Sequence, residues 1–96
     1  MGRSYRSRPA KLGKKLRSIR QKLGLTQPEL IEKLAIKDEP LYPSGISEYE
    51  NGKREPPLLV LLAYARLAGV SMETLVDDKV RLGEIVLHSS KTAAGN

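Results

Sequence analysis

The stretch that decides the fold is residues 23–57, LGLTQPELIEKLAIKDEPLYPSGISEYENGKREPP. Near its start, Thr26 and Glu29 stand at the spacing of a capping box, in which each side chain accepts a hydrogen bond from a free backbone N–H of the other residue. Pro28 lies between them, in the first turn of a helix, where its missing N–H is not needed. These signals predict a helix over residues 27–35.

A second, short helix is predicted from residue 43 or 44 to Glu50, because the following Asn51-Gly52 commonly ends a helix. Its apolar residues Ile46 and Tyr49 are three apart, so they share one face that we expect to point inward. The connection at residues 36–45 contains two prolines and an acidic pair, which cannot continue a helix. It is longer than the turn of roughly 3–4 residues usual between two such helices, and it leaves the angle between them undefined.

Three further helices are predicted on either side of this pair. In residues 11–23, leucine and isoleucine recur at helical spacing, with Lys15 among the basic residues on the other face. Residues 58–68, LLVLLAYARLA, are apolar nearly all round and predict a buried central helix. Ser71 is expected to cap a last helix at residues 72–77. The expected fold is all-α, with five helices around one core.

Four short motifs occur in one register along the chain: Leu25-Thr26-Gln27, Ile46-Ser47-x-Tyr49-Glu50-Asn51-Gly52, Arg54-Glu55-Pro56-Pro57 and Ala68-Gly69-Val70-Ser71. In order and spacing they resemble the phage-repressor and Cro-like family, often called XRE-type, over roughly residues 12–76. The resemblance implies a compact repressor-like helix-turn-helix domain whose third helix enters the major groove of DNA. The long connection at residues 36–45 departs from the family pattern.

Charge is distributed unevenly along the 96 residues. Residues 1–28 contain nine basic and no acidic residues, whereas the remaining 68 residues carry eight basic and eleven acidic ones. Such a basic block suits a polyanion, and nucleic acid is the usual one, because each neutralised phosphate releases counterions. A basic tail that is only solvated is the alternative. The chain has no cysteine, so packing alone must hold its single core together.

We expect three regions along the chain. Residues 1–10 show no periodicity and predict a flexible basic arm. Residues 11–78 would form the helix-turn-helix domain, and residues 79–96 a C-terminal extension that begins with a possible short strand and ends in a disordered tail. No apolar run is long enough to span a bilayer, and the start of the chain does not lead into a signal segment. These features predict a cytoplasmic protein without a membrane partner.

The helix at residues 43–50 carries the side chains expected to read DNA. Its inward face anchors it, which leaves the other face for base edges in the major groove. The residues expected to be exposed on this face are Pro43, Ser44, Gly45, Ser47 and Glu48. The family resemblance implies base contacts from Pro43, Ser44 and Glu48, and we expect Ser47 to be a further one. None of these is an Arg, Asn or Gln, so specificity is expected to depend also on Tyr42, Asn51, the arm and DNA shape. Capping and solvation of a short helix are the alternative roles of Ser44 and Glu48.

Other polar residues are expected to position the protein on the sugar-phosphate backbone. Gln27 begins a helix, where free N–H groups and the helix dipole favour a phosphate. The expected backbone contacts are Gln27, Tyr42, Asn51, Lys53 and Arg54. The arm residues Arg3, Arg6 and Arg8 are expected to enter a neighbouring minor groove or to contact the backbone. The alternatives are that Gln27 is an ordinary exposed residue of a first helical turn, and that Asn51, Lys53 and Arg54 form a solvated turn.

The resemblance also implies a buried ion pair between Arg20 and Glu50, which would tie the first helix to the third. The sequence offers few residues that could carry out catalysis or bind a metal or a nucleotide. His88 is the only histidine, and no catalytic triad, metal-ligand cluster or nucleotide-binding loop can be assembled from the sequence. We therefore expect no enzyme activity, cofactor, metal or small-molecule substrate.

The sequence thus predicts a transcriptional regulator, most simply a repressor that binds a short pseudo-palindromic operator in double-stranded DNA as a homodimer. Candidate dimer contacts are apolar residues that could equally complete the core: Met72, Leu75, Val80, Leu82 and Ile85–Leu87. An antitoxin that binds a toxin through this half, and autoregulates its operon through the helices, is the alternative. RNA binding is disfavoured, because aromatic residues are not interleaved with the basic ones.

Overall fold

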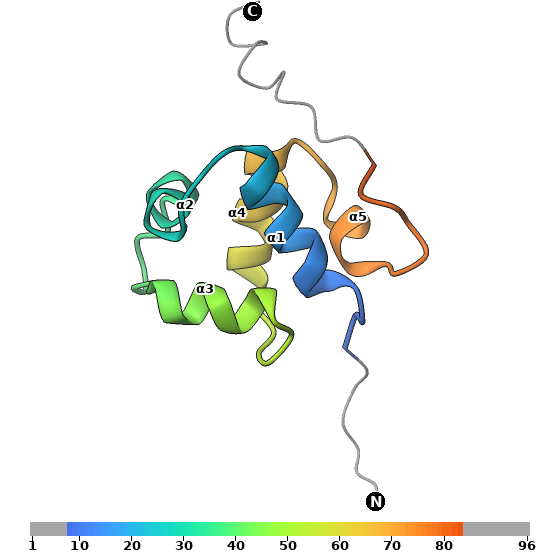
Figure 1. Cartoon of the computed structure of the whole chain (residues 1–96), viewed down its shortest axis with the longest axis horizontal. Helices are drawn as coiled ribbons and strands as arrows, with labels where there is room; N and C mark the ends of the chain where they lie inside the picture. Colours follow the sequence, from blue (N-terminus) through green and yellow to red (C-terminus); the bar gives the residue numbers. More distant parts are fainter. Residues whose placement is uncertain (1–7, 84–96) are drawn as a thin grey trace, which may run out of the picture.

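A computed structural model describes residues 8–83, which form five α-helices and no β-strand (Figure 1). The helices are α1 (Leu12–Lys22), α2 (Gln27–Leu34), α3 (Pro43–Glu50), α4 (Leu58–Ala68) and α5 (Met72–Val76). Helix α3 lies along one edge of the molecule, and α1 crosses between α3 and α5 (Figure 1). The predicted all-α fold is therefore confirmed, and the five helices begin and end close to their predicted bounds.

The capping box predicted for α2 is formed. The Thr26 hydroxyl accepts from the Glu29 backbone N–H at 3.2 Å, and the Glu29 carboxylate accepts from the Thr26 N–H at 2.9 Å. The backbone hydrogen bond from Thr26 lowers the pKa of the Glu29 carboxyl, because it stabilises the charged form. Ala35, the residue that follows α2, adopts the left-handed conformation usually taken by glycine, with φ 54°.

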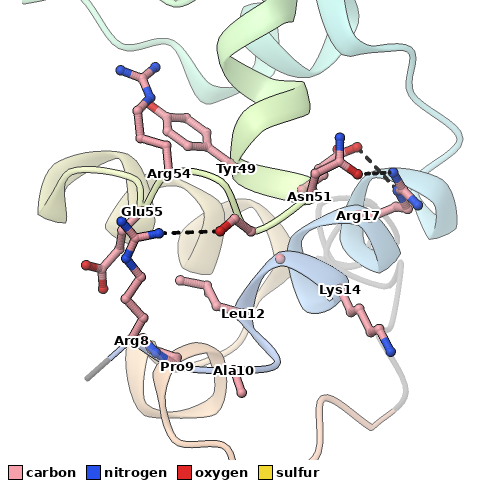
Figure 2. Close-up of a pocket in the computed structure, with 13 residues that line it drawn as sticks. Arg8, Pro9, Ala10, Leu12, Lys14, Arg17, Tyr49, Asn51, Arg54 and Glu55 are labelled. Carbon is pink, nitrogen blue, oxygen red and sulfur yellow. Dashed lines mark hydrogen bonds and ion pairs between the residues drawn. The ribbon is translucent and has the colours of Figure 1, made fainter. Parts of the chain in front are cut away.

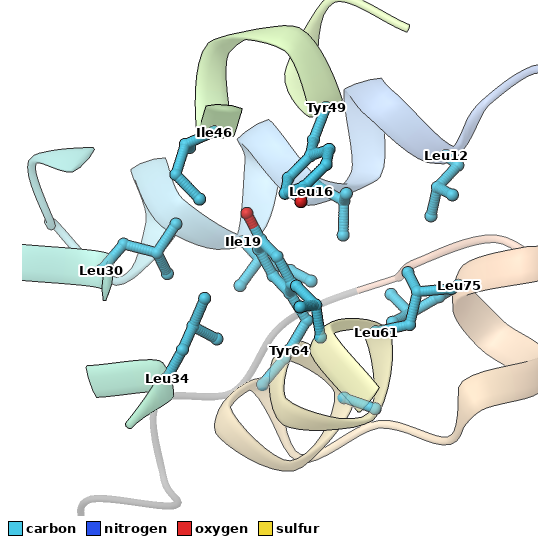
Figure 3. Packing of buried hydrophobic residues seen from close by; sticks show 13 residues of the cluster. Leu12, Leu16, Ile19, Leu30, Leu34, Ile46, Tyr49, Leu61, Tyr64 and Leu75 are labelled. Atoms are coloured by element: carbon cyan, nitrogen blue, oxygen red, sulfur yellow. The ribbon is translucent and has the colours of Figure 1, made fainter. Parts of the chain in front are cut away.

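One hydrophobic core joins all five helices (Figure 3). Its fully buried side chains are Leu16, Ile19, Leu30, Ile46, Val60, Tyr64 and Leu75. Tyr64 is the largest of them, and its hydroxyl has no hydrogen-bond partner among residues 8–83. Burial therefore raises the pKa of Tyr64 far above its ordinary value, since the phenolate would be desolvated. Tyr49 is the other aromatic residue of this core, and its remaining members are aliphatic, in keeping with the lack of Phe and Trp.

Helix α4 contributes one buried face to the core, as predicted, but the prediction of a buried helix fails at its first two residues. Its Val60, Leu61 and Tyr64 enter the core, but Leu58 and Leu59 in its first turn are 69% and 62% exposed. Helices α1, α2 and α5 pack against α4, but they leave Leu58 and Leu59 uncovered. Apolar composition alone does not show which side of a helix a small core can cover.

Helices α1 and α3 approach each other at Gly13. A Cβ atom at this position would lie 2.7 Å from the backbone oxygen of Glu50 and 2.9 Å from that of Tyr49. Glycine is therefore required here by the space available, because any side chain would push the end of α3 away from α1. This contact brings the last turn of α3 directly against the first turn of α1.

Hydrogen bonds join the start of α1 to the end of α5 and the segment after it. The Lys15 ammonium is buried and donates to the carbonyl oxygens of Thr74 at 2.7 Å, Asp77 at 3.0 Å and Val80 at 2.8 Å. In return, the Asp78 carboxylate accepts from the backbone N–H groups that precede α1. The prediction that Lys15 lies on the exposed face of α1 is wrong, because the carbonyl groups at the end of α5 surround its charge.

Helix α5 and the segment that follows it both contribute to the monomer core. Leu75 is fully buried, so it is not available to a second chain, and Leu82 packs against the core cluster. Val80 lies in a turn and Leu82 in coil. Residues 79–83 therefore do not form the start of a strand, and the rest of the predicted strand, Ile85–Leu87, lies outside the described residues.

Replacing Gly13 with alanine tests the close approach of α1 and α3. Alanine normally stabilises a helix interior by about 1 kcal/mol relative to glycine, but here the added atom meets backbone. We expect Gly13→Ala to lower the free energy of unfolding by about 1–3 kcal/mol, measured by urea denaturation. Gly45→Ala in α3 is the matched control, because its Cβ would meet only the flexible end of Arg54 at 3.2 Å. Equal effects of the two variants would contradict the contact.

The contacts of Asp78 predict a dependence of stability on pH. Hydrogen bonds from the N–H groups of Lys11 and Ala10 lower the pKa of its carboxyl. A lowered pKa contributes stability above the ordinary aspartate value of about 4, and this stability is lost as the pH falls through the folded-state pKa. We expect Asp78→Asn to be less stable than the wild type at neutral pH and to lose less stability on acidification. Urea denaturation from neutral to acidic pH measures both, and parallel pH curves would contradict the prediction.

Candidate nucleic-acid interface

Helix α3 presents its first turn to solvent. Pro43, Ser44 and Glu48 are exposed, whereas Ile46 and Tyr49 are buried against the core. The Lys37–Leu41 segment runs beside this turn without covering it, and Tyr42, which precedes the helix, is 62% exposed. The side chains expected at base edges from the first turn are therefore open to solvent, and α3 itself lies along one edge of the molecule (Figure 1).

Two residues of the expected exposed set are only partly accessible. The Gln27 amide donates to the Ser47 hydroxyl at 3.0 Å, and Ser47 is half-buried between α2 and α3. Gly45 is also half-buried, because the Arg54 side chain lies beside it. The hydrogen bond from Gln27 to Ser47 connects the start of α2 to the middle of α3. This bond therefore helps to set the relative position of the two helices.

Arg20 and Glu50 lie together between α1 and the end of α3. Two nitrogen atoms of the Arg20 guanidinium donate to the two carboxylate oxygens of Glu50, at 2.7 and 3.0 Å, and a third donates to the carbonyl of Leu25 at 3.1 Å. The Glu50 side chain is 1% exposed. The hydrogen bond to Glu50 raises the pKa of Arg20, so the guanidinium stays charged. Bidentate pairing of this kind fixes direction as well as distance.

Arg17 belongs to the same cluster and was missed by the sequence reasoning. It donates to the side-chain oxygen of Asn51 at 3.2 Å and lies 3.6 Å from the Glu50 carboxylate (Figure 2). Its spacing of three residues from Arg20 places both on one side of α1, which is the signal that could have identified it. Through Arg17, the turn after α3 is joined to α1.

The arm reaches the same turn. Arg8 donates to the carbonyl of Gly52 at 3.4 Å, next to a surface depression of about 400 Å³ (Figure 2). Four cationic residues line this depression: Arg8, Lys14, Arg17 and Arg54. Lys53 is exposed on the same turn, whereas Arg3 and Arg6 lie outside the described residues. The described end of the arm thus adds positive charge beside α3.

Arg54 lies against α3 itself. Its Nε is 3.1 Å from the Glu48 carboxylate. Its guanidinium is 5.2 Å from the centre of the Tyr49 ring, and these two side chains are seen together in Figure 2. Both members of the ion pair are about half exposed, so solvent screens their attraction and its contribution to stability is small. A guanidinium therefore lies beside α3, although none of the residues of this helix that were expected to contact bases is an arginine.

Other kinds of site are not formed by the part of the chain that the structure describes. Residues 8–83 contain no group of three or more His, Cys, Asp or Glu side chains that could hold a metal ion. None of the five helices has the length and apolar character needed to cross a bilayer. His88 lies outside this part of the chain.

The fold and the exposed α3 define a class of protein, and comparison with known sequences agrees. Residues 13–79 match a family described as a helix-turn-helix domain. The chain therefore belongs to the XRE-type helix-turn-helix family of DNA-binding regulators. It is 40% identical over 65 residues to the HTH-type transcriptional regulator ImmR of Bacillus subtilis (strain 168), an alignment that covers 68% of this chain and 47% of the relative. The chain thus spans about half the length of this curated relative.

Removing one member of the Arg20–Glu50 pair tests its structural role. Arg20→Leu would strand a buried carboxylate, and we expect the free energy of unfolding to fall by about 3–5 kcal/mol. The double variant Arg20→Leu/Glu50→Leu should recover part of this loss, because no buried charge remains. Chemical denaturation of both variants is the measurement, with Arg17→Gln as the control that should have a smaller effect. A double variant less stable than Arg20→Leu would argue against a stranded charge.

Proposed function

We propose that this chain binds double-stranded DNA sequence-specifically and regulates transcription, with α3 placed in the major groove. The observation that carries the proposal is the exposed first turn of α3, held at a defined angle by the Arg20–Glu50 pair. A helix fits the major groove when its first residues are free to meet base edges and its reverse side is anchored. Membership of a family of DNA-binding regulators supports the same conclusion.

The surroundings of α3 suit the phosphate backbone on both sides. On one side, Gln27 stands at the start of α2, where the positive end of the helix dipole favours an anion. On the other side, Asn51 and Lys53 lie in the turn after α3. Arg8 contacts this turn, and Arg3 and Arg6, which lie outside the described residues, are proposed to add contacts in a neighbouring groove. These residues position the protein, and Pro43, Ser44 and Ser47 are the proposed base contacts of α3.

The protein acts as a homodimeric repressor in this proposal. An eight-residue helix reaches only a few base pairs, so a single domain would discriminate poorly among genomic sites. Two copies related by a two-fold axis would place their α3 helices in successive major grooves, about 34 Å apart. Bound in this way, the dimer would block access of other proteins to the operator. The name of the relative, a transcriptional regulator, supports the regulatory part of this proposal.

Selection from a library of random DNA duplexes tests the proposal. We expect enrichment of a short motif with two-fold symmetry and half-site centres about 10 base pairs apart. Sequencing of the bound fragments reports the motif, and sedimentation of the protein with the selected duplex reports the number of copies bound. A bound pool without any enriched motif would contradict sequence-specific binding. An enriched but asymmetric motif, bound by one copy, would contradict the homodimer while leaving DNA recognition intact.

A further inference from the structure

The exposed face of α3 is poor in the side chains that discriminate bases well. Serine donates or accepts with little preference, and proline offers only apolar contact. Arginine makes the commonest specific contact in the major groove, in which two of its nitrogen atoms donate to O6 and N7 of a guanine. No arginine occurs within α3, but the guanidinium of Arg54 lies on its flank. We propose that Arg54 reads a guanine, and that Glu48 orients it.

The backbone after α3 turns back toward the helix. The N–H groups of Lys53 and Arg54 both donate to the carbonyl of Glu48, at 2.9 and 3.3 Å. Gly52 permits this turn because its φ is 75°, a left-handed conformation that residues with a side chain rarely adopt. As a result, the Arg54 side chain starts beside the last turn of α3 and extends back along it.

Three residues of α3 hold the guanidinium at this place. The Glu48 carboxylate pairs with its Nε at 3.1 Å, and the ring of Tyr49 lies 5.2 Å away, within the range of a cation–π contact. Gly45 leaves the space, because a Cβ there would lie only 3.2 Å from the Arg54 Nη2. Alanine would be the better residue for a helix, but its Cβ would displace the end of the Arg54 side chain.

The position of Arg54 suits the groove better than the phosphate ridge. Glu48 and Gly45 belong to the face and flank of the helix that would enter DNA, and the Arg54 side chain is 57% exposed there. The ion pair engages Nε, and a guanidinium has a second edge, formed by Nη1 and Nη2, that can meet O6 and N7 of guanine. A carboxylate that fixes the plane of the guanidinium reduces the freedom lost when the base is bound.

This assignment changes the roles expected from the sequence. Arg54 becomes a base contact instead of a backbone contact, and Glu48 becomes a positioning residue instead of a base contact. The neighbouring Lys53 is the contrast, because its exposed ammonium is a point charge that suits phosphate and carries little base preference. The inference rests on the proposed function, since it concerns which side chain reads the DNA that α3 enters.

Single-base permutation of the selected duplex tests this inference. Dissociation constants would be measured for the wild type and for Arg54→Lys at every position of one half-site. The wild type should prefer guanine at one position by about 5- to 150-fold over the other bases. Arg54→Lys keeps the charge but loses the planar fork, so that preference should fall several-fold while preferences at the other positions persist.

Two further variants assign the roles of the neighbouring residues. Glu48→Gln should weaken the preference at the same position as Arg54→Lys, and the double variant should show little additional loss. Lys53→Gln is the matched control from the same turn, and it should weaken binding to all duplexes by a similar factor. Thermal unfolding of each variant by circular dichroism checks that the fold is kept, which the half-exposed positions of Glu48 and Arg54 favour.

Several outcomes would overturn the inference. An enriched motif without a preferred guanine, or Arg54→Lys with the wild-type preference intact, would return Arg54 to the phosphate backbone. A change caused by Glu48→Gln at a different base position would mean that Glu48 reads DNA directly. These results would leave the proposed function standing, because the wild type would still select a motif. Failure of the wild type to select any duplex would instead overturn the proposed function and this inference with it.

Discussion

The buried pair of Arg20 and Glu50 is the interaction on which the exposed surface depends. Helix α3 has eight residues, and a helix of this length is marginal by itself in water. Its direction is therefore set by what it packs against, and a bidentate pair sets direction more closely than apolar contact does. Gly13 completes the arrangement, because it lets the end of α3 come within contact of the α1 backbone.

The rest of the molecule supports this junction from the far side of α1. Lys15 caps the carbonyl groups at the end of α5, and Asp78 caps the N–H groups that precede α1. The point where the arm joins the domain is thereby held by a residue from the other end of the domain.

Short-range chemistry explains why so much of the fold could be predicted. The capping box, the prolines in first turns and the helical spacing of leucines are local signals, and they identified the helices. The place of Gln27 at a helix start made it a candidate contact, whereas the family, and Ser44 and Glu48 as base contacts, came from the resemblance of short motifs. Local signals failed at Lys15 and Leu58, because a charged side chain can be buried by carbonyl groups far along the chain, and an apolar one can be left uncovered by a small core.

The amino-acid sequence by itself determined which segments are helical, where they end and which family the chain joins, since these depend on neighbouring residues. Only the tertiary structure decided which polar groups meet: Arg17 with Asn51, Gln27 with Ser47, and Arg54 with Glu48. The first two pairs are 34 and 20 residues apart, and the third depends on how the turn after α3 folds back. Such contacts follow from the packing of helices, and the order of residues does not reveal them.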